Sequence, residues 1–104
     1  MITIHKYQLG IEEMPSVEMP RGASVIRVDV QEGKLWIWAV VDTDEPTVRR
    51  EFICRKTGAE FPILECGYSW RYLGFGAIFI KMELGLYVFE KVHVGENGGE
   101  IVVR

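Results

Sequence analysis

A cluster of basic residues at the end of one extended segment is the feature most able to do chemistry. The stretch TVRREFICRKTG, residues 47–58, ends in a lysine, a threonine and a glycine. These three offer an ammonium group, a hydroxyl group and a flexible backbone N–H, which together can bind a phosphate or another anion. The complete GxxxxGK[ST] phosphate loop is absent. The basic and cradle residues are Arg49, Arg50, Arg55, Lys56, Thr57 and Gly58.

Arg50 needs its own explanation, because it falls in an apolar row. Side chains alternate between the faces of a strand, so Arg50 shares one face with Val48 and Phe52. An inward arginine either binds an anion or pairs with an acid inside the fold. The acids that could serve are Glu90 and Glu65. Both interpretations are compatible with the sequence.

Aromatic residues could complete a ligand site. Four aromatic residues could stack on a nucleobase while the arginines hold its phosphates: Trp36, Trp38, Trp70 and Tyr72. The alternative is that they pack in the core or at an interface. The predicted ligand-binding set is Arg50, Arg55, Lys56, Thr57, Gly58, Trp38, Trp70 and Tyr72.

Other kinds of site lack the required patterns. Ser24 and Ser69 lie in no GxSxG elbow, and His5 and His93 have no carboxylate at a telling spacing. We therefore expect neither an enzyme nor a cofactor. The two cysteines, Cys54 and Cys66, follow no CxxC spacing and are interpreted as small, buried or half-buried free thiols, ahead of a disulfide or a zinc site.

Length and composition limit the class of protein. The 104 residues suit a single domain, residues 1–104, and 48% of them are hydrophobic. A net charge of −3 argues against nucleic acid and anionic membranes as partners. No uninterrupted apolar run approaches the roughly 18 residues of a membrane span. The first residues, MITIHKYQLG, show no secretory signal, so a cytoplasmic location is expected.

The elements that must position these residues are strands. No window keeps a helical apolar period without Gly or Pro intruding, whereas β-branched and aromatic runs recur between turn residues. Residues 63–71 have no clean period and are interpreted as a loop. The fold class predicted is all-β, a small antiparallel barrel or sandwich of about seven strands with little or no helix. The strands expected are 2–9, 16–19, 24–31, 34–43, the basic stretch, 72–83 and 86–94, with a turn at 96–99 before 101–104.

Three strands carry specific expectations about their faces. In 24–31, Ile26, Val28 and Val30 should face the core. Residues 34–43 are apolar on both faces, so a loop or a second subunit must cover the outer one, and we expect a homo-oligomer. Gly74 and Gly76 share one face of 72–83, where they would permit the sheet to coil sharply, or another backbone or a ligand to approach closely.

The order of several segments resembles a small, poorly characterised protein family encoded in tailed-phage and prophage genomes. The resemblance runs from Thr3 to Lys91 and is strongest over residues 17–52. It implies an accessory phage protein in the cytosol of a host bacterium, and it implies no catalytic residues. The segments are IHKYQL, VEMPRGASVIRVDVQEGKLWIWAVVD, VRREF, TG, YLG and GLYVFEKV.

Two functions follow as hypotheses. The first is a non-catalytic sponge that sequesters a phosphorylated, nucleotide-derived immune signal of the host, held by the basic strand end and the aromatic residues. The alternative is an inhibitor that binds a host defence protein, with Trp36 and Trp38 as interface residues.

Overall fold

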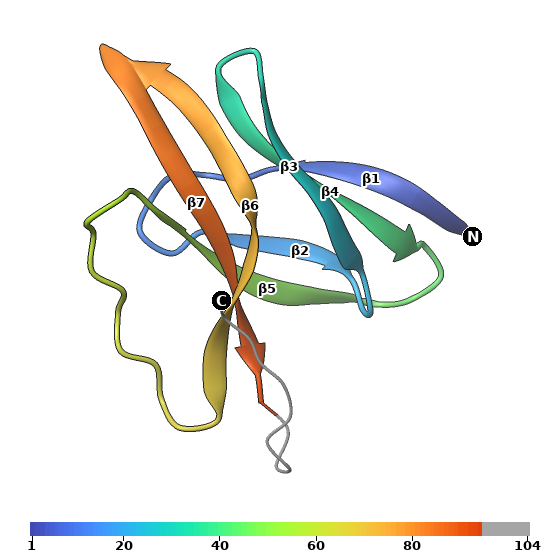
Figure 1. Cartoon of the computed structure of the whole chain (residues 1–104). Helices are drawn as coiled ribbons and strands as arrows, with labels where there is room; N and C mark the ends of the chain where they lie inside the picture. The colour runs from blue at the N-terminus through green and yellow to red at the C-terminus, as the bar shows by residue number, and fades with distance from the viewer. Residues whose placement is uncertain (95–104) are drawn as a thin grey trace.

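Seven antiparallel strands and no helix make up the part of the chain that the computed structural model describes, residues 1–94 (Figure 1). No helix long and apolar enough to cross a membrane occurs in that part. The predicted turn at 96–99 and the segment 101–104 lie outside the described residues. The strands are β1 (Ile2–Gln8), β2 (Ser16–Pro20), β3 (Ser24–Gln31), β4 (Lys34–Asp42), β5 (Thr47–Arg55), β6 (Tyr68–Ile80) and β7 (Met82–His93).

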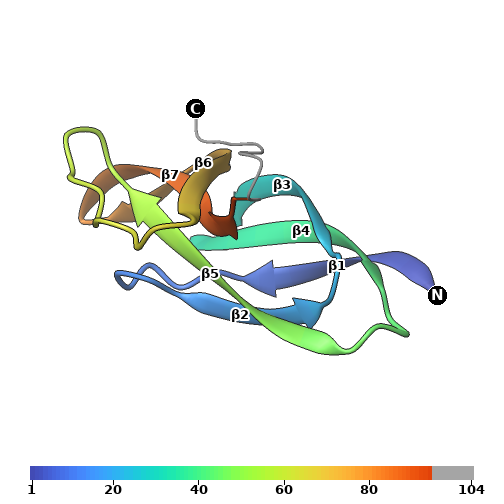
Figure 2. The same ribbon diagram turned by 90° about the horizontal axis from the view of Figure 1, so that it is seen from below.

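The strands form two sheets that pack as an open sandwich. One sheet has the order β1-β4-β3 and the other the order β2-β5-β7-β6. Figure 2 shows β1 beside β4 and β2 beside β5, with the β6–β7 hairpin at one end. The sheets do not close into a barrel. The predicted all-β class and strand number are confirmed, and the sandwich is the alternative that applies.

The core lies between the sheets and is supplied by alternating residues. Every second residue of β4 is almost fully buried, as the period of a strand requires. The basic strand β5 contributes Phe52 from the row that also contains Arg50. The core residues from β4 are Leu35, Ile37, Ala39 and Val41, and those facing them include Met19, Phe52, Leu86 and Val88.

Other groups do approach Gly74 and Gly76 closely, but they are side chains of the opposite sheet and not the backbone or ligand that was expected. A Cβ atom at Gly74 would lie 2.8 Å from Cβ of Val28 on β3, and one at Gly76 would lie 2.7 Å from Cδ1 of Leu35 on β4. The two glycines therefore leave the space into which the side chains of the opposite sheet pack, and they bring β6 against β3.

The outer face of β4 is covered by cations from its neighbours. Lys6 Nζ lies 4.3 Å from the ring centre of Trp36, and the Arg27 guanidinium lies 4.4 Å from that of Trp38. Both tryptophans are half-buried as a result. Among residues 1–94, long charged side chains of the same sheet cover this face in place of the expected loop, and their stems lie along apolar surface. The expected second subunit stays a prediction.

Two expectations about the strands are wrong: which residues of 24–31 face the core, and where the strand 72–83 ends. Ile26 is 53% exposed, because a β-bulge between Val25 and Arg27 inserts one residue and turns Val25 inward in its place. The predicted break between strands 72–83 and 86–94 is misplaced: Gly85 lies within β7, and the turn is at Lys81. A Cβ atom at Gly85 would lie 2.8 Å from the Phe75 ring.

Candidate functional site

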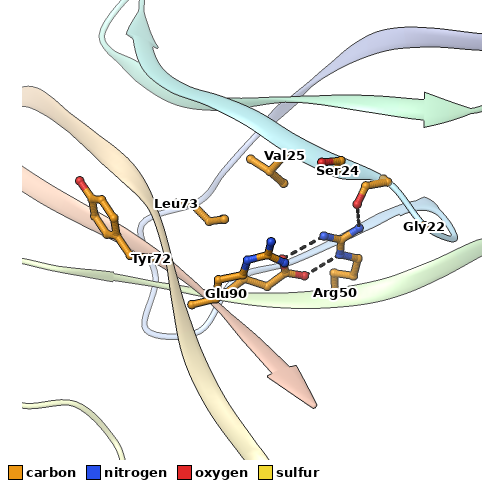
Figure 3. Close-up of a pocket in the computed structure, with 9 residues that line it drawn as sticks. Gly22, Ser24, Val25, Arg50, Tyr72, Leu73 and Glu90 are labelled. Carbon is orange, nitrogen blue, oxygen red and sulfur yellow. Dashed lines mark hydrogen bonds and ion pairs between the residues drawn. The ribbon is translucent and has the colours of Figure 1, made fainter. Parts of the chain in front are cut away.

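Arg50 is held by a carboxylate inside the sandwich. Its Nε donates to Glu90 Oε2 at 2.5 Å and its Nη2 donates to Glu90 Oε1 at 2.9 Å (Figure 3). Its Nη1 donates to the backbone carbonyl of Ala23 at 2.6 Å. Glu90 is only 4% exposed. Of the two interpretations of Arg50, pairing with an inward acid is confirmed, and Glu90 is the acid.

The pairing of β5 with β7 explains this contact. Phe52 lies opposite Glu90 in the antiparallel register, so both side chains project from the inner face. Arg50 lies two residues before Phe52 and therefore on that same face. The ion pair is therefore a consequence of strand alternation and register.

A cleft of about 360 Å³ opens beside the ion pair. It lies between the start of β3 and the bulge in β6 at residues 72–74. Figure 3 shows Arg50 and Glu90 pointing toward one another within it, and places Gly22 and Tyr72 at opposite ends. The lining residues are Gly22, Ala23, Ser24, Val25, Arg50, Arg71, Tyr72, Leu73 and Glu90.

Arg71 gives this cleft a second guanidinium group. It lies opposite Glu90 in the register of β6 and β7, so it projects from the same inner face. Within residues 1–94, the Arg71 side chain donates no hydrogen bond and forms no ion pair, in contrast to Arg50. The cleft therefore contains two guanidinium groups and one carboxylate, and it favours an anion.

Tyr72 lines the cleft, but its ring packs away from the cleft. The ring packs against Phe89 in an edge-on contact, with centroids 5.4 Å apart. It is exposed at the rim, at the far end from Gly22 (Figure 3).

The rest of the predicted basic cluster lies elsewhere. Arg55 is five residues from Arg50, and this odd spacing places it on the outer face of the sheet, 3.9 Å from Glu13. Lys56, Thr57 and Gly58 follow the end of β5 in an exposed turn, where Gly58 has a φ of +90°. These four residues do not meet Arg50.

The two predicted tryptophans lie on opposite outer faces of the sandwich. Trp38 is on the outer face of β4, beneath Arg27. Trp70 is 7% exposed on the outer face of β6, packed with Ile53 and Phe89 beneath the 56–67 segment. The packing interpretation is the one that the structure supports for Trp70, and neither ring faces the cleft.

Both cysteines are free, and Cys54 is half-buried as predicted. Cys66 is exposed, so the prediction of a buried or half-buried thiol is wrong there. Burial and the charge of Glu12 raise the pKa of the Cys54 thiol to about 11, because both disfavour the thiolate. Cys66 is exposed in the segment before β6. Within residues 1–94, no three His, Cys, Asp or Glu side chains gather as a metal site would require.

Sequence reasoning missed Arg71, because residues 63–71 were interpreted as a loop. The strand β6 begins at Tyr68, and its first residues do alternate: Tyr68, Trp70 and Tyr72 occupy one face. That period-two aromatic pattern is the signal that would have placed Arg71 on the inner face.

Residues 1–98 match the family model of a domain of unknown function, DUF7352. The chain belongs to the DUF7352 family. No curated protein and no solved structure matches it. The matched range contains all seven strands and every residue that lines the cleft, so the cleft is part of the DUF7352 domain itself. The match does not bear on a phage origin, which stays a prediction.

Proposed function

We propose that this DUF7352 protein is a non-catalytic binding protein that sequesters a small phosphorylated, nucleotide-like anion in the cleft beside Arg50 and Glu90. In this proposal it acts as an accessory protein of a phage in the cytosol of the host bacterium, where the ligand is an immune signal. The phage setting rests on the resemblance over residues 3–91, and the ligand rests on the cleft.

The observation that carries the ligand is the excess guanidinium of Arg71. The carboxylate of Glu90 is engaged by two nitrogen atoms of Arg50, so among residues 1–94 no carboxylate of the cleft compensates the charge of Arg71. A planar guanidinium presents parallel N–H groups that match two oxygens of a phosphate. The hydroxyl of Ser24 adds one more donor among the lining residues.

The chemistry of the lining favours binding over turnover. The one carboxylate there is held by Arg50, and the lining residues include no histidine, cysteine or lysine. General acid–base and nucleophilic catalysis both need such a group within reach of the ligand. A cleft of about 360 Å³ falls at the small end of ligand sites, which suits one mononucleotide.

A melting-temperature panel tests the proposal. Cyclic nucleotides, ADP-ribose derivatives and inorganic phosphate are added in excess to the folded protein. A ligand present at about a hundred times its Kd should raise the melting temperature by roughly 10 °C, since it binds only the native state.

Arg71→Ala should remove this rise, because it removes the guanidinium group proposed to bind the ligand. Arg71 is exposed, and within residues 1–94 its side chain forms no hydrogen bond or ion pair, so the variant should still fold. Lys56→Ala is the matched control: it removes one cation from the predicted basic cluster, outside the cleft, and should leave the rise intact. If no compound raises the melting temperature, or if both variants lose the rise equally, this function is withdrawn.

The second candidate is an inhibitor that binds a host defence protein through the outer face of β1, β4 and β3. Exposed apolar side chains on the two neighbours of β4 support this candidate. They are Ile2 and Ile4 on β1 and Ile26 on β3. Trp38→Ala should then abolish capture of the host protein, while Arg71→Ala should not affect it.

A further inference from the structure

The hairpin formed by β6 and β7 carries large apolar side chains that no described residue covers. Its turn is at Lys81, which has a φ of +63°, and Figure 1 shows its tip extending away from β1, β2 and β5. Contiguous exposed apolar surface of this kind marks an interaction site. The exposed fractions are 45% for Phe75, 72% for Phe79, 51% for Ile80, 67% for Met82 and 39% for Tyr87.

Both faces of the tip are apolar. Phe79 lies opposite Glu83 on one face, whereas Ile80 lies opposite Met82 on the other. Phe75 and Tyr87 continue the first face toward the body, with ring centroids 4.8 Å apart. A partner that covers all of these side chains must therefore contact both faces of the hairpin, because a flat surface would contact only one.

The charges of the hairpin are balanced and adjacent. Between Leu73 and Phe89 the charged residues are Lys81 and Glu83, one of each sign. A strongly acidic or basic partner would match one of them and repel the other. A second copy related by a two-fold axis would match both, because each contact i to j is repeated as j to i.

We propose that a second copy of this chain covers the β6–β7 hairpin in a two-fold dimer, with Lys81 of each copy facing Glu83 of the other. The exposed area of the five apolar side chains is on the order of 500 Å² in each copy, given that a large side chain buries roughly 200 Å². The pair would bury about 1,000 Å², the lower limit of a specific interface. The dimer is therefore weak and depends on concentration.

This interface differs from the one expected at β4. There the apolar rings of Trp36 and Trp38 already lie beneath Lys6 and Arg27 of the same chain. The hairpin tip has no such cover among residues 1–94. The inference is independent of the ligand proposed for the cleft, whose lining residues lie nearer the other end of β6.

Sedimentation velocity over a micromolar to millimolar range tests the dimer. The wild type should shift from one to two copies as its concentration rises. Lys81→Glu and Glu83→Lys should each weaken the dimer about tenfold or more, because each creates facing charges of like sign. An equimolar mixture of these two variants should associate again, and the double variant Lys81→Glu with Glu83→Lys should recover the wild-type behaviour.

Phe79→Ser tests the apolar part and should shift the equilibrium toward monomer, with a native melting transition as the check on folding. Ile2→Ser is the matched control, since Ile2 is equally exposed but lies on β1. A wild type that stays monomeric throughout the range overturns the proposal. A dimer whose dissociation constant is unchanged by both charge reversals also overturns it. The same holds if Ile2→Ser dissociates the dimer and Phe79→Ser does not.

Discussion

The guanidinium group of Arg50 connects the two sheets of the sandwich at Glu90 and Ala23. It lies on β5, donates two hydrogen bonds to Glu90 on β7, and donates a third to the carbonyl that precedes β3. The first two bonds stay within one sheet, whereas the third reaches the other. One side chain thus fixes the start of β3 over the inner face of β5.

Removing one partner of this pair should be costly. Glu90→Ala leaves the half-buried charge of Arg50 without its carboxylate, and we expect a loss of about 3–5 kcal/mol in the free energy of unfolding. The double variant Arg50→Met with Glu90→Leu should recover most of that loss, since it leaves no unpaired charge. Urea denaturation of the wild type, Glu90→Ala and the double variant measures both effects. Equal stability of the single and double variants would contradict this account.

The two glycines of β6 should differ in their tolerance of a methyl group. At Gly74 the new Cβ would meet Cβ of Val28, which cannot rotate away, so the strands must separate. At Gly76 it would meet Cδ1 of Leu35, the end of a side chain that can change rotamer.

We therefore expect Gly74→Ala to cost about 1–3 kcal/mol, as overpacked cores do, and Gly76→Ala to cost less. Thermal denaturation of the two variants measures the difference. A larger loss for Gly76→Ala than for Gly74→Ala would contradict this account. It would show that β6 can move away from Val28 more easily than Leu35 can change rotamer.

The two thiols should react at different pH. Because the thiolate is the nucleophile, the raised pKa of Cys54, about 11, keeps it unreactive in the folded protein near pH 8. Iodoacetamide should then modify Cys66, which is exposed, and leave Cys54 unmodified until the pH approaches 11 or the protein unfolds. Peptide mapping after brief exposure checks this, with Cys66→Ser as the control that should take up no label at pH 8.

The same shift has a consequence for stability, whose sign follows from linkage. The folded state holds the proton of Cys54 more tightly than the unfolded state, whose thiol titrates near 9.0. This contribution is complete below pH 9 and is lost as the pH rises toward 11. Cys54→Ala should flatten the alkaline decline of the unfolding free energy. An unchanged pH profile in this variant would refute the assignment.

Lys6 should shield Trp36 from water. Its Nζ lies over the ring and donates a hydrogen bond to Gln31 at 2.7 Å, which fixes the side chain across β4. Lys6→Ala should shift tryptophan emission to longer wavelength and lower stability by about 0.5–1 kcal/mol. Lys34→Ala, on the same sheet and with no aromatic contact among the described residues, should change neither quantity.

Much of the fold could be predicted because strand periodicity is local. The buried row of β4 and the inward position of Arg50 follow from alternation alone, and Gly74 with Gly76 signalled a close approach. The errors arose where alternation is interrupted. The bulge at Ile26 reverses the phase of a strand through one inserted residue, and no residue type in that run announces it.

The candidate site was less accessible to sequence reasoning. Arg50 and Glu90 are 40 residues apart, and the sequence alone left Glu65 as an equal partner. Strand parity could already have separated Arg50 from Arg55, since an odd spacing places them on opposite faces. Arg71 required knowledge that β6 starts at Tyr68 and lies opposite Glu90, which is long-range pairing.

The approach of Gly74 to Val28 has a consequence for how these chains can diverge. The two positions cannot accept bulk independently, so a lineage that gains a side chain at the first must lose one at the second. An alignment of DUF7352 members should therefore display paired substitution between β6 and β3, and such covariation would report the contact without any coordinates.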